Sequence, residues 1–115
     1  MHELSIALSV LEMAEEEAAR RGNVSVAAIH IKLGPLAGVI KQALASAYDV
    51  ARECTSLAEC ELIVDDMPLI VTCGPCGATL EARSVQDICC PNCGSVDVKI
   101  VAGRELEVSA LEIIE

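Results

Sequence analysis

The sequence predicts an α+β fold, a small three-stranded mixed sheet covered by two helices, with a cysteine-rich module inserted before the last strand. Two stretches repeat apolar residues at helical spacing, and three shorter stretches alternate apolar with polar residues as half-buried strands do. Two close pairs of cysteines lie between the second and third of these strands. The predicted order is helix, strand, helix, strand, cysteine-rich module and strand.

The first helix is predicted from a regular apolar series: Leu4, Ala7, Leu8, Leu11, Ala14 and Ala18. Arg20 and Arg21 place cations in the last turn and Gly22 stops the helix, so it should end near Arg21. On its outer side, Glu12 and the run from Glu15 to Glu17 are interpreted as solvated charge.

Val24 to Leu33 is rich in β-branched residues and is predicted as the first strand, which Gly34-Pro35 ends. Ile29 and Ile31 share one face of this strand, and His30 points to the opposite, polar face. A second helix should follow, with an inward stripe formed by Ile40, Ala43, Leu44, Ala47, Ala51 and Cys54.

The other two strands are predicted from alternation. In the second strand the inward positions are Cys60, Leu62 and Val64. In the third they are Leu106, Val108 and Ala110. The second helix can connect two parallel strands, and the inserted module would then return the last strand beside the second, antiparallel to it. Cys54 and Cys60 are both interpreted as buried thiols.

This order divides the chain into two domains. Residues 1–69 plus 104–115 form an α/β domain that includes the N-terminus, and residues 70–103 form an inserted four-cysteine domain. The insert is too short to be stable through apolar burial alone, so its folding should depend on a bound ion.

Composition narrows the class of protein. A chain of 115 residues with 53% hydrophobic content can bury one modest core, and no apolar run approaches the roughly 20 residues of a membrane span. The N-terminus lacks an export signal, so the seven cysteines are expected to be reduced, in a soluble protein. A net charge of -10 and a single aromatic residue, Tyr48, argue against nucleic-acid binding.

The paired cysteines predict a metal site. Cys73-Gly-Pro-Cys76 and Cys90-Pro-Asn-Cys93 each hold two sulfurs in one tight turn, and Gly77 and Gly94 follow where the chain reverses. Two such hooks supply a complete tetrahedral thiolate shell, as in a zinc ribbon, and zinc is the expected ion. Cys89 does not fit the two-residue spacing and is interpreted as a bystander.

The main rival interpretation is a rubredoxin-like iron electron carrier, because the same hooks also suit iron. The short segment between the hooks and the near absence of aromatic residues count against it. The sequence contains no Ser/His/Asp set and no phosphate loop, and a closed four-thiolate site has no open position for water, so no enzyme is expected.

The N-terminus is a second candidate metal site. The α-amine of Met1, the amide nitrogen of His2 and the His2 imidazole can form fused five- and six-membered chelate rings. An amide nitrogen loses its proton only to a metal that favours planar nitrogen ligands, which means Ni(II) or Cu(II). Alone this signal is weak, since many chains carry histidine at position 2 by chance.

Taken together, the two ends of the chain resemble the HypA/HybF family of hydrogenase nickel-insertion proteins. The resemblance rests on Met1-His2-Glu3-Leu4-Ser5, on Lys32-Leu33-Gly34 after the first strand and on the two cysteine hooks, and it covers essentially the whole chain. It implies a cytoplasmic nickel metallochaperone that binds Ni(II) through His2, with backbone groups of Met1 and Glu3. It also implies structural zinc on Cys73, Cys76, Cys90 and Cys93.

The resemblance further implies that nickel is passed to a [NiFe]-hydrogenase large-subunit precursor with help from a HypB-type GTPase. The sequence leaves both a monomer and a homodimer open. Some relatives complete a nickel plane with a second histidine from the metal module, but residues 72–103 contain none here. The fourth donor therefore stays open between Glu3, water and a partner's side chain.

Overall fold

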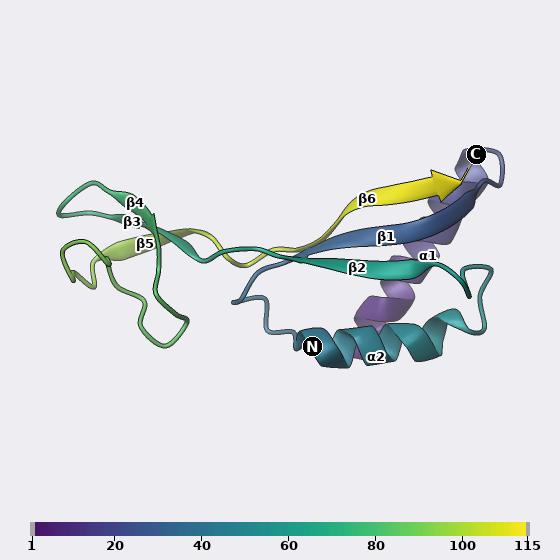
Figure 1. The fold of residues 1–115 in the computed structure, drawn as a ribbon, viewed down its shortest axis with the longest axis horizontal. Coiled ribbons are helices and arrows are strands. Elements are labelled where there is room, and N and C mark those ends of the chain that lie inside the picture. Colours follow the sequence, from purple (N-terminus) through teal and green to yellow (C-terminus); the bar gives the residue numbers. More distant parts are fainter. Residues whose placement is uncertain (1, 115) are drawn as a thin grey trace. The chain divides into compact units, whose positions relative to one another are not determined.

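The structure of the chain is a computed structural model that describes residues 2–114 (Figure 1). Its helices and strands follow the predicted order. The cysteine-rich module, for which no internal elements were predicted, contains three short strands. The elements are α1 (Glu3–Arg20), β1 (Ser25–Leu33), α2 (Lys41–Arg52), β2 (Glu61–Asp66), β3 (Ile70–Cys73), β4 (Thr79–Glu81), β5 (Val98–Ala102) and β6 (Leu106–Ile114). The predicted α+β class is confirmed.

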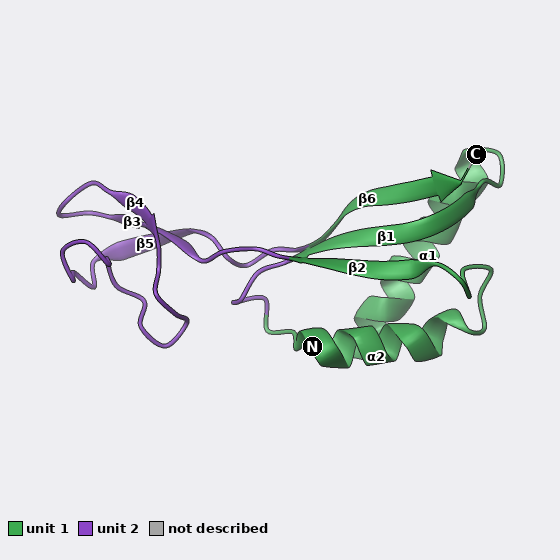
Figure 2. Cartoon of the chain, in the orientation of Figure 1, with its two compact units in different colours: residues 1–32, 38–65, 107–115 green, residues 33–37, 66–106 purple. Residues whose placement is uncertain are grey.

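Two compact units make up the chain, and Figure 2 colours them separately. The α/β unit comprises residues 1–32, 38–65 and 107–115, and the cysteine unit comprises residues 33–37 and 66–106. Within residues 2–114, no helix is both long enough and apolar enough to cross a membrane.

The sheet of the α/β unit has the strand order β2-β1-β6. Strands β1 and β2 run in the same direction, connected through α2, whereas β6 runs the opposite way (Figure 1). The prediction that the last strand lies beside the second is wrong, because β6 pairs with β1. The physical reason is burial. Strand β1 carries five buried residues whereas β2 and β6 carry none, so the most apolar strand occupies the centre, where a neighbour covers each edge.

Helix α1 buries Ala7, Val10, Leu11, Ala14 and Ala18. Leu4 and Leu8 were predicted on the same inward stripe but are 49% and 50% exposed. Leu8 lies at the margin of a stripe centred on the alanines, and Leu4 lies in the first turn. Two of the glutamates interpreted as solvated have partners, since Glu17 pairs with both terminal arginines and Glu15 accepts a 2.7 Å hydrogen bond from the Ser56 hydroxyl.

Helix α2 buries Leu44 and Tyr48, so the predicted stripe is correct at its centre and wrong at both ends. Ile40 precedes the helix as its N-cap and is 69% exposed, and Cys54 lies beyond its last residue and is exposed. Tyr48 was left out of the predicted stripe although it is one of the most deeply buried side chains. Cys60 is buried as predicted.

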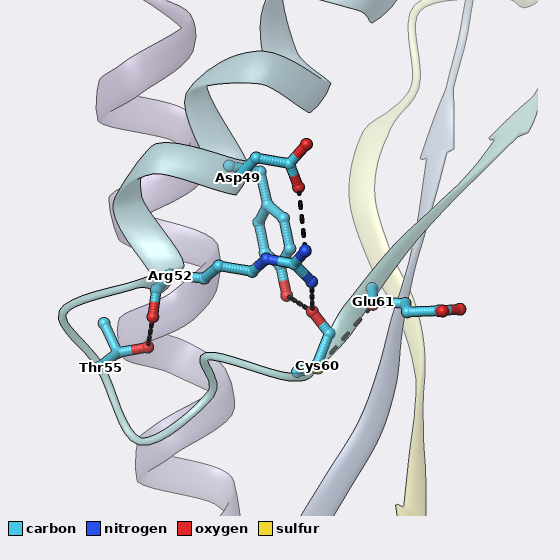
Figure 3. A network of polar contacts seen from close by, with 6 residues as sticks. Asp49, Arg52, Thr55, Cys60 and Glu61 are labelled. Carbon is cyan, nitrogen blue, oxygen red and sulfur yellow. Dashed lines mark hydrogen bonds and ion pairs between the residues drawn. The ribbon is translucent and has the colours of Figure 1, made fainter.

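Figure 3 shows how the end of α2 is joined to the start of β2. The Tyr48 hydroxyl donates a 2.8 Å hydrogen bond to the Cys60 carbonyl, and Arg52 Nη1 donates a 2.7 Å hydrogen bond to the same oxygen. Arg52 also lies 3.4 Å from Asp49 and stacks over the Tyr48 ring. One buried carbonyl is thus held by two side-chain donors from the helix.

The cysteine unit has an antiparallel sheet of order β4-β3-β5. Its apolar core is small, with Leu69, Val71 and Ala82 buried and Leu36, Ile88, Val98 and Ile100 packed against them. Leu36 lies in the loop after β1. The backbone of this loop is hydrogen-bonded to the segment between β5 and β6. Gly34 donates to the Glu105 carbonyl and Leu36 to the Gly103 carbonyl, both at 2.8 Å. A side chain at position 34 would place its Cβ 2.2 Å from the Gly103 oxygen, so glycine is needed there.

Candidate metal centre

The two cysteine hooks have the same backbone geometry. In the first, the Gly77 amide donates to the Cys73 carbonyl at 2.9 Å, and in the second the Gly94 amide donates to the Cys90 carbonyl at 2.8 Å. Both glycines have positive φ, at 71° and 79°, with open space around them. The glycines are therefore needed for their backbone conformation and not for lack of room, as the sequence predicted.

These hooks bring four sulfur atoms together. Cys73 Sγ lies 3.5 Å from Cys93 Sγ, Cys76 Sγ lies 3.6 Å from Cys90 Sγ, and all four atoms lie within 4.8 Å of one another. Sulfurs about 2.3 Å from a tetrahedral ion are separated by about 3.8 Å. The spacing of the thiols therefore fits a single four-coordinate metal ion.

The four thiols differ in exposure. Cys73 and Cys90, the first cysteine of each hook, are buried, whereas Cys76 and Cys93 are exposed. The Asn92 amide lies 3.9 Å from Cys76 Sγ and can donate to that sulfur. Two of the four cysteines are thus shielded from solvent, and the other two are exposed to it.

Two of the thiols also differ in acidity. The Cys93 backbone amide, together with the Asn92 amide and the neighbouring thiols, lowers the pKa of the Cys90 thiol to about 6 despite its burial. The Cys76 amide acts to lower the pKa of Cys73, but burial and the neighbouring thiols outweigh it and raise that pKa to about 12. The metal-free cluster can therefore hold a thiolate on Cys90 while Cys73 keeps its proton.

Cys89 stands apart from the sulfur cluster. Its Sγ donates a 3.2 Å hydrogen bond to Asp87 Oδ1, and this bond, followed by burial, raises the pKa of the thiol. A thiol that is turned to a carboxylate and resists ionisation is a poor metal ligand. This geometry agrees with its interpretation as a bystander.

The proposed N-terminal ligands begin α1. His2 is the N-cap residue, has extended backbone (φ -86°, ψ 124°), is exposed, and makes no side-chain capping hydrogen bond. Its carbonyl accepts the first helical hydrogen bond, from the Ile6 amide at 3.2 Å. Glu3 follows as the first helical residue. Met1, and with it the predicted α-amine ligand, lies outside the described residues.

His30 lies on the polar face of β1, as predicted, and its side chain is 23% exposed. It has carboxylate neighbours on both adjacent strands, which nothing in the local sequence around position 30 indicates. Finding them requires the strand order and register, because Asp65 and Glu112 are distant in the chain.

Comparison with known proteins assigns the chain to a family. The family described as "Hydrogenase/urease nickel incorporation, metallochaperone, hypA" matches residues 1–113. The chain belongs to the HypA family. The resemblance proposed from the two ends of the sequence is thereby confirmed over nearly the whole chain, and the family is one of nickel metallochaperones for hydrogenase maturation.

Curated HypA relatives match along nearly their full length. The hydrogenase maturation factor HypA of Roseiflexus sp. (strain RS-1) is 43% identical over 112 residues, which cover 97% of this chain and 91% of the relative. The protein of the same name from Chloroflexus aurantiacus is 41% identical, covering 97% of this chain and 98% of its own.

Solved HypA structures share the fold. The solution structure of the Ni metallochaperone HypA from Helicobacter pylori matches with a TM-score of 0.67 over 99% of this chain and 98% of that one. A second solution structure of a HypA protein gives a TM-score of 0.72 over 99% and 97%. Both are 23% identical to this chain, so they bear on its fold alone.

Proposed function

We propose that this chain carries Ni(II) at its N-terminus and delivers it for maturation of a [NiFe]-hydrogenase. His2 supplies the imidazole, and backbone nitrogens of Met1, His2 and Glu3 supply further donors. A HypB-type GTPase and the hydrogenase large-subunit precursor are the proposed partners, in the cytoplasm, and the protein acts as a carrier and not as an enzyme. Membership of the HypA family supports the cargo and the process.

The observation that carries the nickel site is the position of His2 at the N-cap of α1. The first amides of a helix have no intrahelical acceptor, so the nitrogens of His2 and Glu3 can bind a metal without breaking the helix. The exposed imidazole is open to an incoming ion. The positive end of the helix dipole opposes a cation, and loss of amide protons to Ni(II) would offset that repulsion.

In the same proposal, Cys73, Cys76, Cys90 and Cys93 hold structural zinc. Four thiolates at tetrahedral spacing leave no open position on the ion, which suits a structural role. Zinc is favoured over iron because Tyr48, the single aromatic residue, belongs to the α/β unit, so the cysteine unit has no aromatic side chain around the metal. The colour of the purified protein separates the two, since ferric tetrathiolate is red and zinc thiolate is colourless.

The decisive experiment is a nickel titration of the native chain and of His2→Ala, with zinc content measured in parallel. We expect His2→Ala to abolish tight nickel binding and to leave zinc unchanged. A third protein with residues added before Met1 should bind nickel almost as weakly, because its α-amine has become a peptide nitrogen. Native nickel affinity in His2→Ala would refute the N-terminal site.

A further inference from the structure

His30 lies between two carboxylates that the neighbouring strands contribute. Its Nδ1 is 3.7 Å from Asp65 Oδ2 on β2, and its Nε2 is 3.5 Å from Glu112 Oε1 on β6. The two acidic side chains are 51% and 58% exposed, so the group is open to solvent on its outer side. All three residues belong to the α/β unit.

A neutral imidazole cannot satisfy both carboxylates. It carries one N–H, which can donate to one of them, and its other nitrogen then presents a lone pair to the second carboxylate. Two electron-rich atoms 3.5 Å apart repel each other unless a cation lies between them. The arrangement therefore favours a metal ion between the ring and that carboxylate.

The distances suit a metal ion on one side of the ring. Two ligand atoms about 2.1 Å from an ion, at a tetrahedral angle, are about 3.4 Å apart, close to the spacing of His30 Nε2 and Glu112 Oε1. The carboxylates face opposite nitrogens, so a single ion does not reach both. Asp65 would instead accept the Nδ1 proton and orient the ring, as second carboxylates commonly do for metal-binding histidines.

We propose that His30 and Glu112 form a second divalent-cation site, with Asp65 as the positioning residue and water completing the coordination. One imidazole and one carboxylate suit Ni(II), Zn(II) or Co(II). Two protein ligands and an exposed position make the site weak and quick to exchange. Lys32, two residues along β1 on the same face, is the nearest cation on that strand and also weakens it.

The site is independent of the N-terminal chelate, and its test uses full-length, zinc-loaded His2→Ala protein. Ni(II) alone is titrated by calorimetry, and the bound ion is located by the loss of NMR signals around it. We expect signals of residues next to His30, on β1 and on the facing parts of β2 and β6, to broaden first.

Three variants in the same His2→Ala background define the ligands. His30→Gln and Glu112→Gln should each raise the dissociation constant of this site at least about tenfold, and Asp65→Asn by a smaller factor. Glu107→Gln is the matched control, because it removes one negative charge from another exposed position of β6, five residues along the strand from Glu112. It should change the constant less than about twofold, and zinc content should stay constant throughout.

Three results would overturn the proposal. One is unchanged Ni(II) binding in His30→Gln. Another is an equal loss in Glu107→Gln and Glu112→Gln, which would mean that overall charge alone attracts the ion. The third is no Ni(II) uptake by the His2→Ala parent up to about 1 mM free ion.

Discussion

Hydrogen bonds to single sulfur atoms set the acidity of individual thiols in the cysteine unit. Two backbone amides, those of Cys93 and Asn92, favour the thiolate form of Cys90, whereas Cys73 has only the Cys76 amide, which burial and the neighbouring thiols outweigh. Cys89, the immediate neighbour of Cys90, is bonded to Asp87 and stays protonated. Adjacent cysteines therefore differ in chemistry because of their hydrogen bonds.

The contrast between Cys89 and the four clustered cysteines predicts which cysteine-to-serine variants lose zinc. Cys76→Ser and Cys93→Ser each remove one sulfur from the cluster and should release zinc, whereas Cys89→Ser should keep it. The variants that release zinc should lose structure mainly in the cysteine unit, because its core of Leu69, Val71 and Ala82 is small. Zinc per chain and amide-resolved NMR measure both effects. Stoichiometric zinc in Cys76→Ser and Cys93→Ser would contradict the assignment.

Among the secondary-structure elements, the sequence predicts what depends on neighbours in the chain. The hooks and the start of β1 follow from spacing, glycines and β-branched residues that act within a few positions. The pairing of β6 with β1, the exposure of Cys54 and the depth of Tyr48 depend on contacts between distant segments. Local patterns carry no information on those contacts, and this is why these predictions failed or were missing.

The contact between α2 and β2 predicts how stability changes at high pH. Burial of the Tyr48 hydroxyl raises its pKa well above the ordinary value, and the hydrogen bond between Tyr48 and Cys60 raises it further. The unfolded chain ionises near pH 10 while the folded chain does not, so this contribution to the free energy of unfolding is complete below pH 10 and lost as pH rises further. The chain has one tyrosine, so phenolate absorbance reports on Tyr48 alone. This absorbance should appear at a higher pH in the folded protein than in the denatured protein.

The Tyr48→Phe variant is the control for that titration. It should lower the free energy of unfolding by only about 1 kcal/mol at neutral pH, because Arg52 still donates to the Cys60 carbonyl. Between about pH 10 and pH 11 it should lose less stability than the native chain, as measured by urea unfolding. Equal losses in both proteins would mean that another group causes the alkaline instability.

At the scale of the whole molecule, the proposed cargo is the nickel ion at the N-terminus, and its binding should depend on pH. Nitrogen ligation at the N-terminus requires a neutral imidazole and displaces at least one amide or amine proton, so nickel binding should be proton-linked. If one proton is released per ion, the dissociation constant for nickel should rise about tenfold for each unit of pH lowered. Calorimetry in buffers of different ionisation enthalpy counts the protons. A constant affinity between mild acid and neutrality would argue against nitrogen ligands.

The loop after β1 also limits how this protein can be divided by genetic engineering. A gene fragment encoding residues 66–106 would look like a self-contained metal module, yet it would lack Leu36, which packs on that module's core. It would also lack the Leu33 carbonyl, which accepts from the Met67 amide at 2.8 Å, and the Leu36 amide, which donates to Gly103. The module is therefore discontinuous in the gene. A transplant into another protein would need a short second piece, residues 33–37, supplied from elsewhere in the host chain.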